Sequence, residues 1–68
     1  MEWYEIIKRV RTQKGISLRS TEVATGILNP YLCQLENGKI KNPSFFKMLI
    51  LLDFLGIDIR MLPAPKEG

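Results

Sequence analysis

The sequence predicts an all-α fold, a compact bundle of four to five helices, to which a short C-terminal β-strand is added. Two features of the sequence support this prediction. Apolar residues recur at helical spacing in separate stretches, and residues that begin or end helices stand at the borders of those stretches. The segments between them are short, which places consecutive helices next to one another in a single bundle.

The length and composition of the chain restrict how such a bundle can be stabilised. Its 68 residues form one domain with a small hydrophobic core, which often needs a disulfide, a metal or a partner chain. The single cysteine, Cys33, cannot form an intrachain disulfide, and in the absence of histidine we expect neither a metal site nor a cofactor. Association of two chains is therefore the expected source of additional stability.

The first predicted helix covers residues 2–13, where four apolar side chains recur at helical spacing: Trp3, Ile6, Ile7 and Val10. Gly15 follows this helix as a left-handed cap. Ser17 is expected to cap a second helix over residues 18–24, which ends at Thr25 and Gly26. We assign Trp3 to the core, with base stacking as the less favoured role.

The third helix has the clearest beginning in the sequence. Asn29 is expected to be its N-cap and Pro30 its first helical residue, where the missing N–H costs nothing. Leu32 and Leu35 give the helix one apolar edge, and the Asn-Gly pair at 37–38 ends it. The second and third helices thus lie on either side of a tight turn.

A fourth helix and a tail complete the predicted domain. Ser44 is expected to cap a helix that runs to about Leu55 and ends at Gly56. Residues 57–62 then alternate apolar and polar, a pattern typical of a half-buried strand that pairs with its counterpart in a second chain. A helical tail is the alternative. The domain should span residues 1–62, followed by a flexible tail over residues 63–68.

Positive charge is concentrated in the middle of the chain. Residues 8–47 contain eight lysines or arginines and two glutamates, a net charge of +6, whereas the remaining residues sum to −3. A basic centre between acidic ends is typical of a surface that binds a polyanion such as nucleic acid. A solvated helix face would give the same pattern, so the charge alone leaves both interpretations open.

Four segments of the chain resemble the Cro/repressor-type (XRE-like) helix-turn-helix family. They are residues 11–19 (RTQKGISLR), 24–27 (ATGI), 31–39 (YLCQLENGK) and 42–44 (NPS), and the similarity covers about residues 7–59. The resemblance implies a bundle of four or five helices whose third helix enters the major groove of double-stranded DNA.

The resemblance also implies which residues of the third helix read bases. The expected base readers are Asn29, Pro30, Tyr31 and Gln34. Gln34 and Asn29 can each pair with adenine through two hydrogen bonds, whereas Pro30 offers only apolar contact. Tyr31 can contact a thymine methyl group or a phosphate.

Residues that flank the third helix are the expected phosphate contacts: Arg19, Asn37, Lys39 and Lys41, together with the backbone amides around Asn37 and Gly38. Relatives commonly carry glutamine where this chain has Leu18, so one backbone contact is lost here. Arg11 and Glu36 are interpreted as a structural pair, because the matching residues of the family form a partly buried salt bridge. Cys33 is expected to be a small filler.

The fourth helix carries more apolar residues than one buried face requires. Phe46 and Ile50 stand where relatives usually carry polar residues, and Phe54 stands where small residues are common. A helix that is apolar on all sides is expected to be buried on all sides. We therefore predict a twofold dimer interface made of Phe46, Ile50, Phe54, Ile57, Ile59 and Met61.

These expectations describe a homodimeric, sequence-specific DNA-binding repressor or autoregulator with a palindromic operator. One alternative is the antitoxin of a toxin–antitoxin pair, with a toxin as its partner, because the tail resembles HipB-like antitoxins that carry a C-terminal strand. A protein-bridging or RNA-associated adapter is another. An enzyme is not expected, because without histidine no nucleophile-plus-base arrangement is present. The lone cysteine and the lack of a signal or membrane-length apolar stretch favour the cytoplasm, with no membrane partner.

Overall fold

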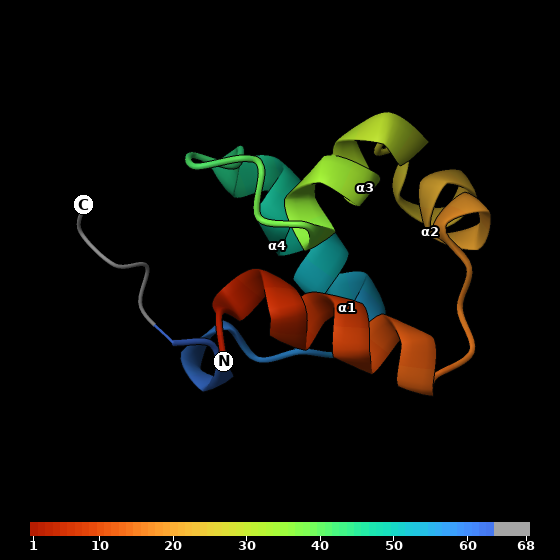
Figure 1. The fold of residues 1–68 in the computed structure, drawn as a ribbon. Helices are drawn as coiled ribbons and strands as arrows, with labels where there is room; N and C mark the ends of the chain where they lie inside the picture. The colour runs from red at the N-terminus through yellow and green to blue at the C-terminus, as the bar shows by residue number, and fades with distance from the viewer. Residues whose placement is uncertain (64–68) are drawn as a thin grey trace.

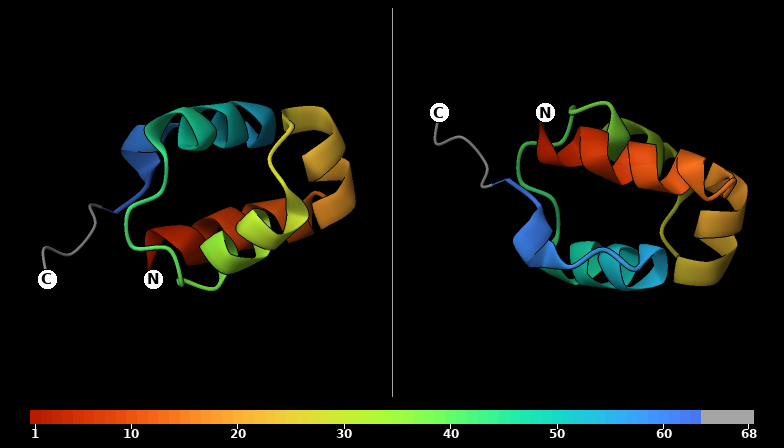
Figure 2. Two further views of the ribbon diagram at one scale, coloured as in Figure 1. Left: turned by 90° about the horizontal axis from the view of Figure 1, so that it is seen from above. Right: turned by 90° about the horizontal axis from the view of Figure 1, so that it is seen from below.

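Four α-helices and one 3-10 turn follow one another along residues 1–63, the part of the chain that the computed structural model describes. They are α1 (Trp3–Gln13), α2 (Leu18–Thr25), α3 (Asn29–Glu36), α4 (Phe45–Leu55) and η1 (Ile59–Met61), as Figure 1 shows. From above and below, α1 and α3 form one side of the molecule, α4 forms the other, and α2 closes one end (Figure 2). The all-α bundle expected from the sequence is confirmed.

The predicted cap residues form the boundaries of α2 and α4. The Ser17 hydroxyl accepts a hydrogen bond of 3.0 Å from the Ser20 N–H at the start of α2. The Ser44 hydroxyl accepts one from the Lys47 N–H at the start of α4. At the end of α2, Gly26 has a φ of 76°, a conformation that costs glycine little. The turn that follows, residues 26–28, is short enough to set α3 directly against α2.

The start of α3 differs from the prediction by one residue. Asn29 is the first residue of the helix, and Leu28 takes the N-cap position with an extended backbone. Pro30 is tolerated in the first turn, because its missing N–H belongs to the groups that have no partner within the helix. The prediction that Asn29 is the N-cap was therefore wrong.

The core lies between the α1–α3 side and α4. Seven apolar side chains are at most 3% exposed: Ile7, Ile27, Leu32, Leu35, Leu51, Leu52 and Leu55. From α2, the buried residue is Thr21, whose hydroxyl donates to the Ser17 carbonyl and so keeps a partner inside the core. Trp3 is partly buried and packs against this cluster, as its spacing in the first helix predicts.

The tail does not form the predicted strand. Residues Ile59–Met61 make a 3-10 turn instead, in which the Met61 N–H donates to the Asp58 carbonyl at 2.8 Å. The Asp58 carboxylate accepts hydrogen bonds from the guanidinium and from the backbone N–H of Arg60, which lower the pKa of Asp58. These local bonds close the backbone into a turn, and within residues 1–63 there is no strand with which the tail could pair. The antitoxin alternative loses the strand on which it rested.

The domain boundary proposed at residue 62 falls just after this turn. Residues 64–68, most of the expected flexible tail, lie outside the described residues. Within residues 1–63, no helix combines the length and apolar character that crossing a membrane requires.

Candidate nucleic-acid interface

One edge of α3 faces outward along its whole length. Pro30, Cys33, Gln34 and Asn37 are exposed, whereas Leu32, Leu35 and Glu36 are buried. The exposed positions recur every three or four residues, so they share one face of the helix. Two of the expected base readers, Pro30 and Gln34, therefore lie together on the outer edge, and Asn29 is half-buried at its beginning. Cys33 also lies on this edge with an exposed thiol, so its expected role as a small filler applies to the outer face and stays a prediction.

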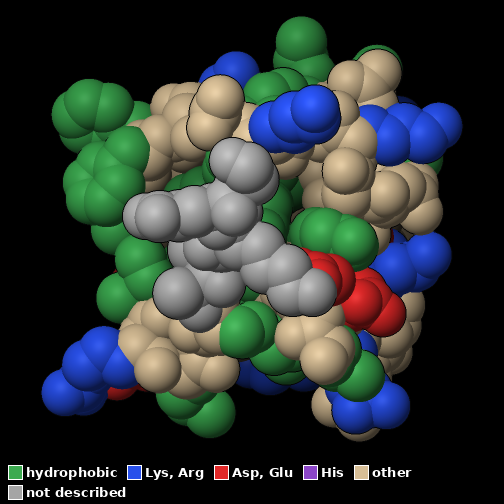
Figure 3. Space-filling model, turned by 60° about the vertical axis from the view of Figure 1, so that its left-hand side comes forward, with side chains coloured by type: hydrophobic (Ala, Val, Ile, Leu, Met, Phe, Trp, Pro, Cys, Tyr) green, Lys and Arg blue, Asp and Glu red, His purple; other side chains and the backbone are tan. Residues whose placement is uncertain are grey.

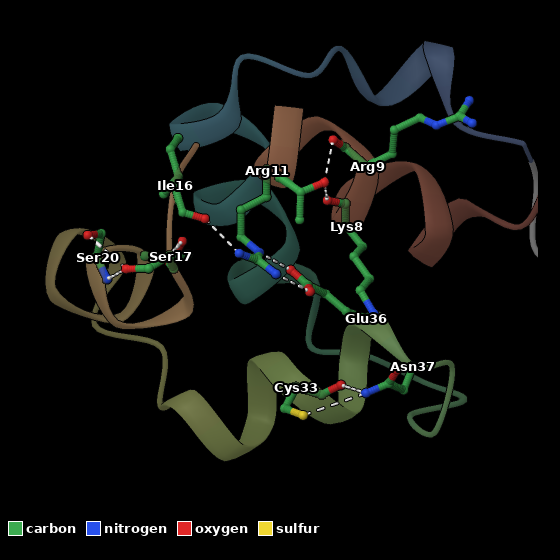
Figure 4. Close-up of polar contacts among 11 residues, drawn as sticks. Lys8, Arg9, Arg11, Ile16, Ser17, Ser20, Cys33, Glu36 and Asn37 are labelled. Carbon is green, nitrogen blue, oxygen red and sulfur yellow. Dashed lines mark hydrogen bonds and ion pairs between the residues drawn. The ribbon is translucent and has the colours of Figure 1, made fainter. Parts of the chain in front are cut away.

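Arg11 and Glu36 join α1 to the last residue of α3. The Arg11 Nε and Nη2 atoms donate to the two carboxylate oxygens of Glu36 at 2.6 and 2.8 Å (Figure 4). A third bond runs from Arg11 Nη1 to the Ile16 carbonyl at 2.6 Å, which ties the α1–α2 connection to the same group. The hydrogen bond to Glu36 raises the pKa of Arg11. Because both residues are buried, the pair anchors α3.

Tyr31 connects α3 to the start of α4. Its hydroxyl accepts a hydrogen bond of 3.1 Å from the Ser44 N–H, and the Lys47 ammonium lies 4.2 Å from the centre of its ring. The ring packs against the core and is half-buried. The sequence placed Tyr31 among the base readers, whereas these contacts direct its hydroxyl toward the loop that precedes α4.

The C-terminal end of α3 uses the backbone amides that were expected to bind phosphate. The N–H groups of Asn37, Gly38 and Lys39 donate to carbonyls of α3 at 3.2, 3.1 and 2.9 Å. The Asn37 side-chain amide donates to the Cys33 carbonyl at 2.8 Å (Figure 4). These bonds satisfy the last carbonyls of the helix, and phosphate binding by these amides stays a prediction.

Basic side chains stand before and after α3 along the chain. Arg19 is exposed in the first turn of α2, and Lys39 and Lys41 are exposed in the loop that follows α3. One cation therefore precedes the turn between α2 and α3 along the chain, and two cations follow α3. No group of three potential metal ligands occurs among residues 1–63.

Sequence reasoning missed two residues that contact the ends of α3. Glu22 of α2 accepts a hydrogen bond from the Asn29 N–H through Oε2 at 2.6 Å. The ring of Tyr4 lies against Gly38, so close that a Cβ atom on Gly38 would be 2.5 Å from its Cζ. Leu28, an apolar residue at an N-cap position, is the one sequence signal that an unusual cap was needed.

The fold and this edge can be compared with known proteins. The sequence model of a family described as Helix-turn-helix matches residues 7–62, which include most of α1 and all of α2, α3, α4 and η1. The chain belongs to the helix-turn-helix family. This is a family of DNA-binding domains, and α2 and α3 form its two-helix unit.

Two curated relatives have been named trifunctional NAD biosynthesis/regulator protein NadR, from Salmonella typhimurium and Escherichia coli. Each is 38% identical to this helix-turn-helix chain over 58 residues, which is 85% of the chain. The chain spans only 14% of the length of each relative. The similarity therefore covers only the helix-turn-helix region. The biosynthetic activities in the name NadR refer to those longer proteins.

Proposed function

We propose that this protein is a sequence-specific regulator of transcription that binds double-stranded DNA, most simply as a repressor or autoregulator. The exposed edge of α3 carries the proposal, because its inner edge is fixed in the core while Gln34 projects outward. Helix-turn-helix proteins insert such a helix into the major groove. The word "regulator" in the name of the NadR relatives adds support.

The contacts follow from the chemistry of the exposed side chains. Gln34 can form two hydrogen bonds with the N6 and N7 atoms of adenine, and Asn29 can do the same near the start of the helix. Pro30 contributes an apolar contact. Arg19, Lys39 and Lys41 neutralise phosphates on either side of the groove, and Asn37 adds a polar group at the helix end.

A homodimer is part of the proposal, and α4 supplies its surface. Phe46, Ile50 and Phe54 are 76%, 46% and 36% exposed, although all three are apolar. They recur at intervals of four residues, so they form one stripe along α4. Figure 3 shows hydrophobic side chains gathered at the upper left, where α4 lies. A second copy would bury this stripe by twofold symmetry.

The tail carries further exposed apolar side chains. Ile59 and Met61 are 51% and 73% exposed, while Ile57 is half-buried against the core. An apolar groove of about 370 Å³ adjoins them, with Trp3, Phe45, Met48, Ile59 and Leu62 among its lining residues. We include the tail in the proposed interface, because Ile59 and Met61 expose apolar side chains shortly after α4 ends. Two α3 helices held by such a dimer would read a palindromic operator.

Selection of duplexes from a random DNA pool tests this function without knowledge of the operator. The purified protein should enrich one motif with two inverted half-sites about one helical turn apart. The Gln34→Ala variant should lose preference at one base pair of each half-site, while Lys39→Ala should weaken binding to all duplexes alike. Recovery of an unchanged pool by the wild-type protein would contradict the proposal.

A further inference from the structure

The first turn of α3 lacks the cap that helices usually carry. Leu28 occupies the N-cap position, where Ser, Thr, Asp or Asn normally accepts a hydrogen bond from the first turn. Pro30 removes one backbone donor from the same turn. The N–H of Asn29 is instead bound by a residue of the preceding helix, since the Glu22 carboxylate accepts from it at 2.6 Å.

Glu22 contacts the backbone on both sides of the turn that separates the two helices. Its carbonyl oxygen accepts a hydrogen bond from the Gly26 N–H at 2.8 Å, which closes the end of α2. Its carboxylate binds Asn29, which begins α3. Because this second bond is charge-assisted and part-buried, it fixes the start of α3 relative to α2 more firmly than a neutral bond would.

From these contacts we infer that Glu22 is a positioning residue for DNA recognition, which holds Asn29 and the beginning of the reading edge in register. This inference rests on the proposed function. The carboxylate also places a negative charge at the positive end of α3, where a helix otherwise attracts phosphate. The negative charge therefore repels the DNA backbone from the N-terminal end of α3 and directs that end to base edges. The phosphate contacts come from the cations of α2 and of the loop that follows α3.

A residue that only stabilised the fold would have a different effect on binding. Its loss would lower the affinity for every duplex in proportion to the unfolded fraction of the protein. Loss of a positioning contact to Asn29 should instead reduce discrimination at the base pair that Asn29 reads and leave the pair read by Gln34 unchanged.

Three variants separate these roles: Glu22→Ala, Glu22→Gln and Asp53→Ala. They are titrated against the selected duplex and against duplexes with single substitutions at the Asn29 and Gln34 positions, with the folded fraction of each variant measured by circular dichroism. Glu22→Ala should reduce discrimination at the Asn29 position by roughly tenfold. Glu22→Gln keeps an acceptor oxygen but loses the charge, so its discrimination should fall between that of Glu22→Ala and that of the wild type. Asp53→Ala removes an exposed carboxylate from α4 and should discriminate as the wild type does.

A rescue variant makes the test independent of overall stability. In Glu22→Ala/Leu28→Ser, a serine at the N-cap position can accept the N–H of Tyr31, the third residue of the helix, and so restore a cap. Discrimination at the Asn29 position should return toward the wild-type value. Equal discrimination by wild type and Glu22→Ala, or an equal loss at both positions, would overturn the inference.

The exchange rate of the Asn29 amide hydrogen distinguishes failure of this inference from failure of the proposed function. The amide should be protected in the wild type and exchange faster in Glu22→Ala. A wild-type protein that binds all duplexes equally, whatever this rate, would overturn the DNA-binding proposal and the positioning role with it. Selective wild-type binding with equally fast Asn29 exchange in both proteins would overturn the role of Glu22 alone.

Discussion

Gly38 lies directly against the aromatic ring of Tyr4, so a Cβ atom at this position would be 2.5 Å from Cζ and 2.8 Å from Cε2 of that ring. Gly38 also has a φ of 72° and follows the last residues of α3. The residue is therefore required for two reasons, the backbone conformation and the space. This contact fixes where the chain leaves α3 and passes toward Lys39 and Lys41.

Alanine substitutions at two glycines separate the effect of the backbone conformation from the effect of the space. At Gly26, with φ of 76° and nothing within 4 Å of the added Cβ, Gly26→Ala should destabilise the fold by about 1–2 kcal/mol through backbone strain alone. Gly38→Ala should cost about 1–3 kcal/mol more, because the ring must move. Urea denaturation followed by Trp3 fluorescence measures both. Equal losses of stability at the two positions would show that the Tyr4 ring moves aside without an energetic cost.

The Arg11–Glu36 pair should contribute more to the stability of the fold than to contacts with DNA. Arg11→Met leaves the Glu36 carboxylate buried without its partner, which should cost about 3–5 kcal/mol. The double variant Arg11→Met/Glu36→Leu should recover most of that loss, because no uncompensated charge remains. Thermal unfolding of the three proteins provides the measurement. A double variant no more stable than Arg11→Met would refute this explanation.

Tyr31→Phe tests whether the hydroxyl of Tyr31 serves the fold or the bases. Removal of the acceptor for the Ser44 N–H should destabilise the protein by about 0.5–1.5 kcal/mol. The ring and its contact with Lys47 remain, so the preferred DNA sequence should not change. Duplex selection with the variant provides the check, and a shifted motif would restore Tyr31 to the base readers.

A charged substitution in the apolar stripe of α4 should dissociate the proposed dimer. Phe46→Glu places two carboxylates in a twofold interface, so sedimentation should show monomers where the wild type shows dimers. Val23→Glu is the matched control, because Val23 is as exposed as Phe46, at 76%, but belongs to α2. A wild-type protein that is already monomeric at concentrations that bind DNA would contradict the interface.

The sequence predicted most helix boundaries because they have a local chemical signal. Ser17 and Ser44 accept backbone hydrogen bonds three residues ahead, and Gly26 ends α2 without any distant partner. Such signals lie within a few residues of the backbone that they fix. The Arg11–Glu36 pair was expected from the family resemblance, since residues 25 positions apart are not brought together by any local rule.

The failed predictions involve partners that the local pattern does not contain. The alternation over residues 57–62 is typical of a strand, yet the bonds between Asp58 and Arg60 close it into a turn. The cap of α3 comes from Glu22, seven residues before Asn29 and on another helix. A helical projection that places Tyr31 outward likewise does not show that its hydroxyl reaches Ser44, thirteen residues later, in the folded chain. Its base-reading role stays a prediction.

Fluorescence-anisotropy titration tests most directly whether the exposed edge of α3 reads DNA. The protein is titrated against the duplex upstream of its own gene and against a scrambled duplex, at two salt concentrations. We predict binding to the upstream duplex about a thousandfold tighter than to the scrambled one, and weaker binding to both at higher salt. Equal, weak affinity for the two duplexes would contradict autoregulation by this edge of α3.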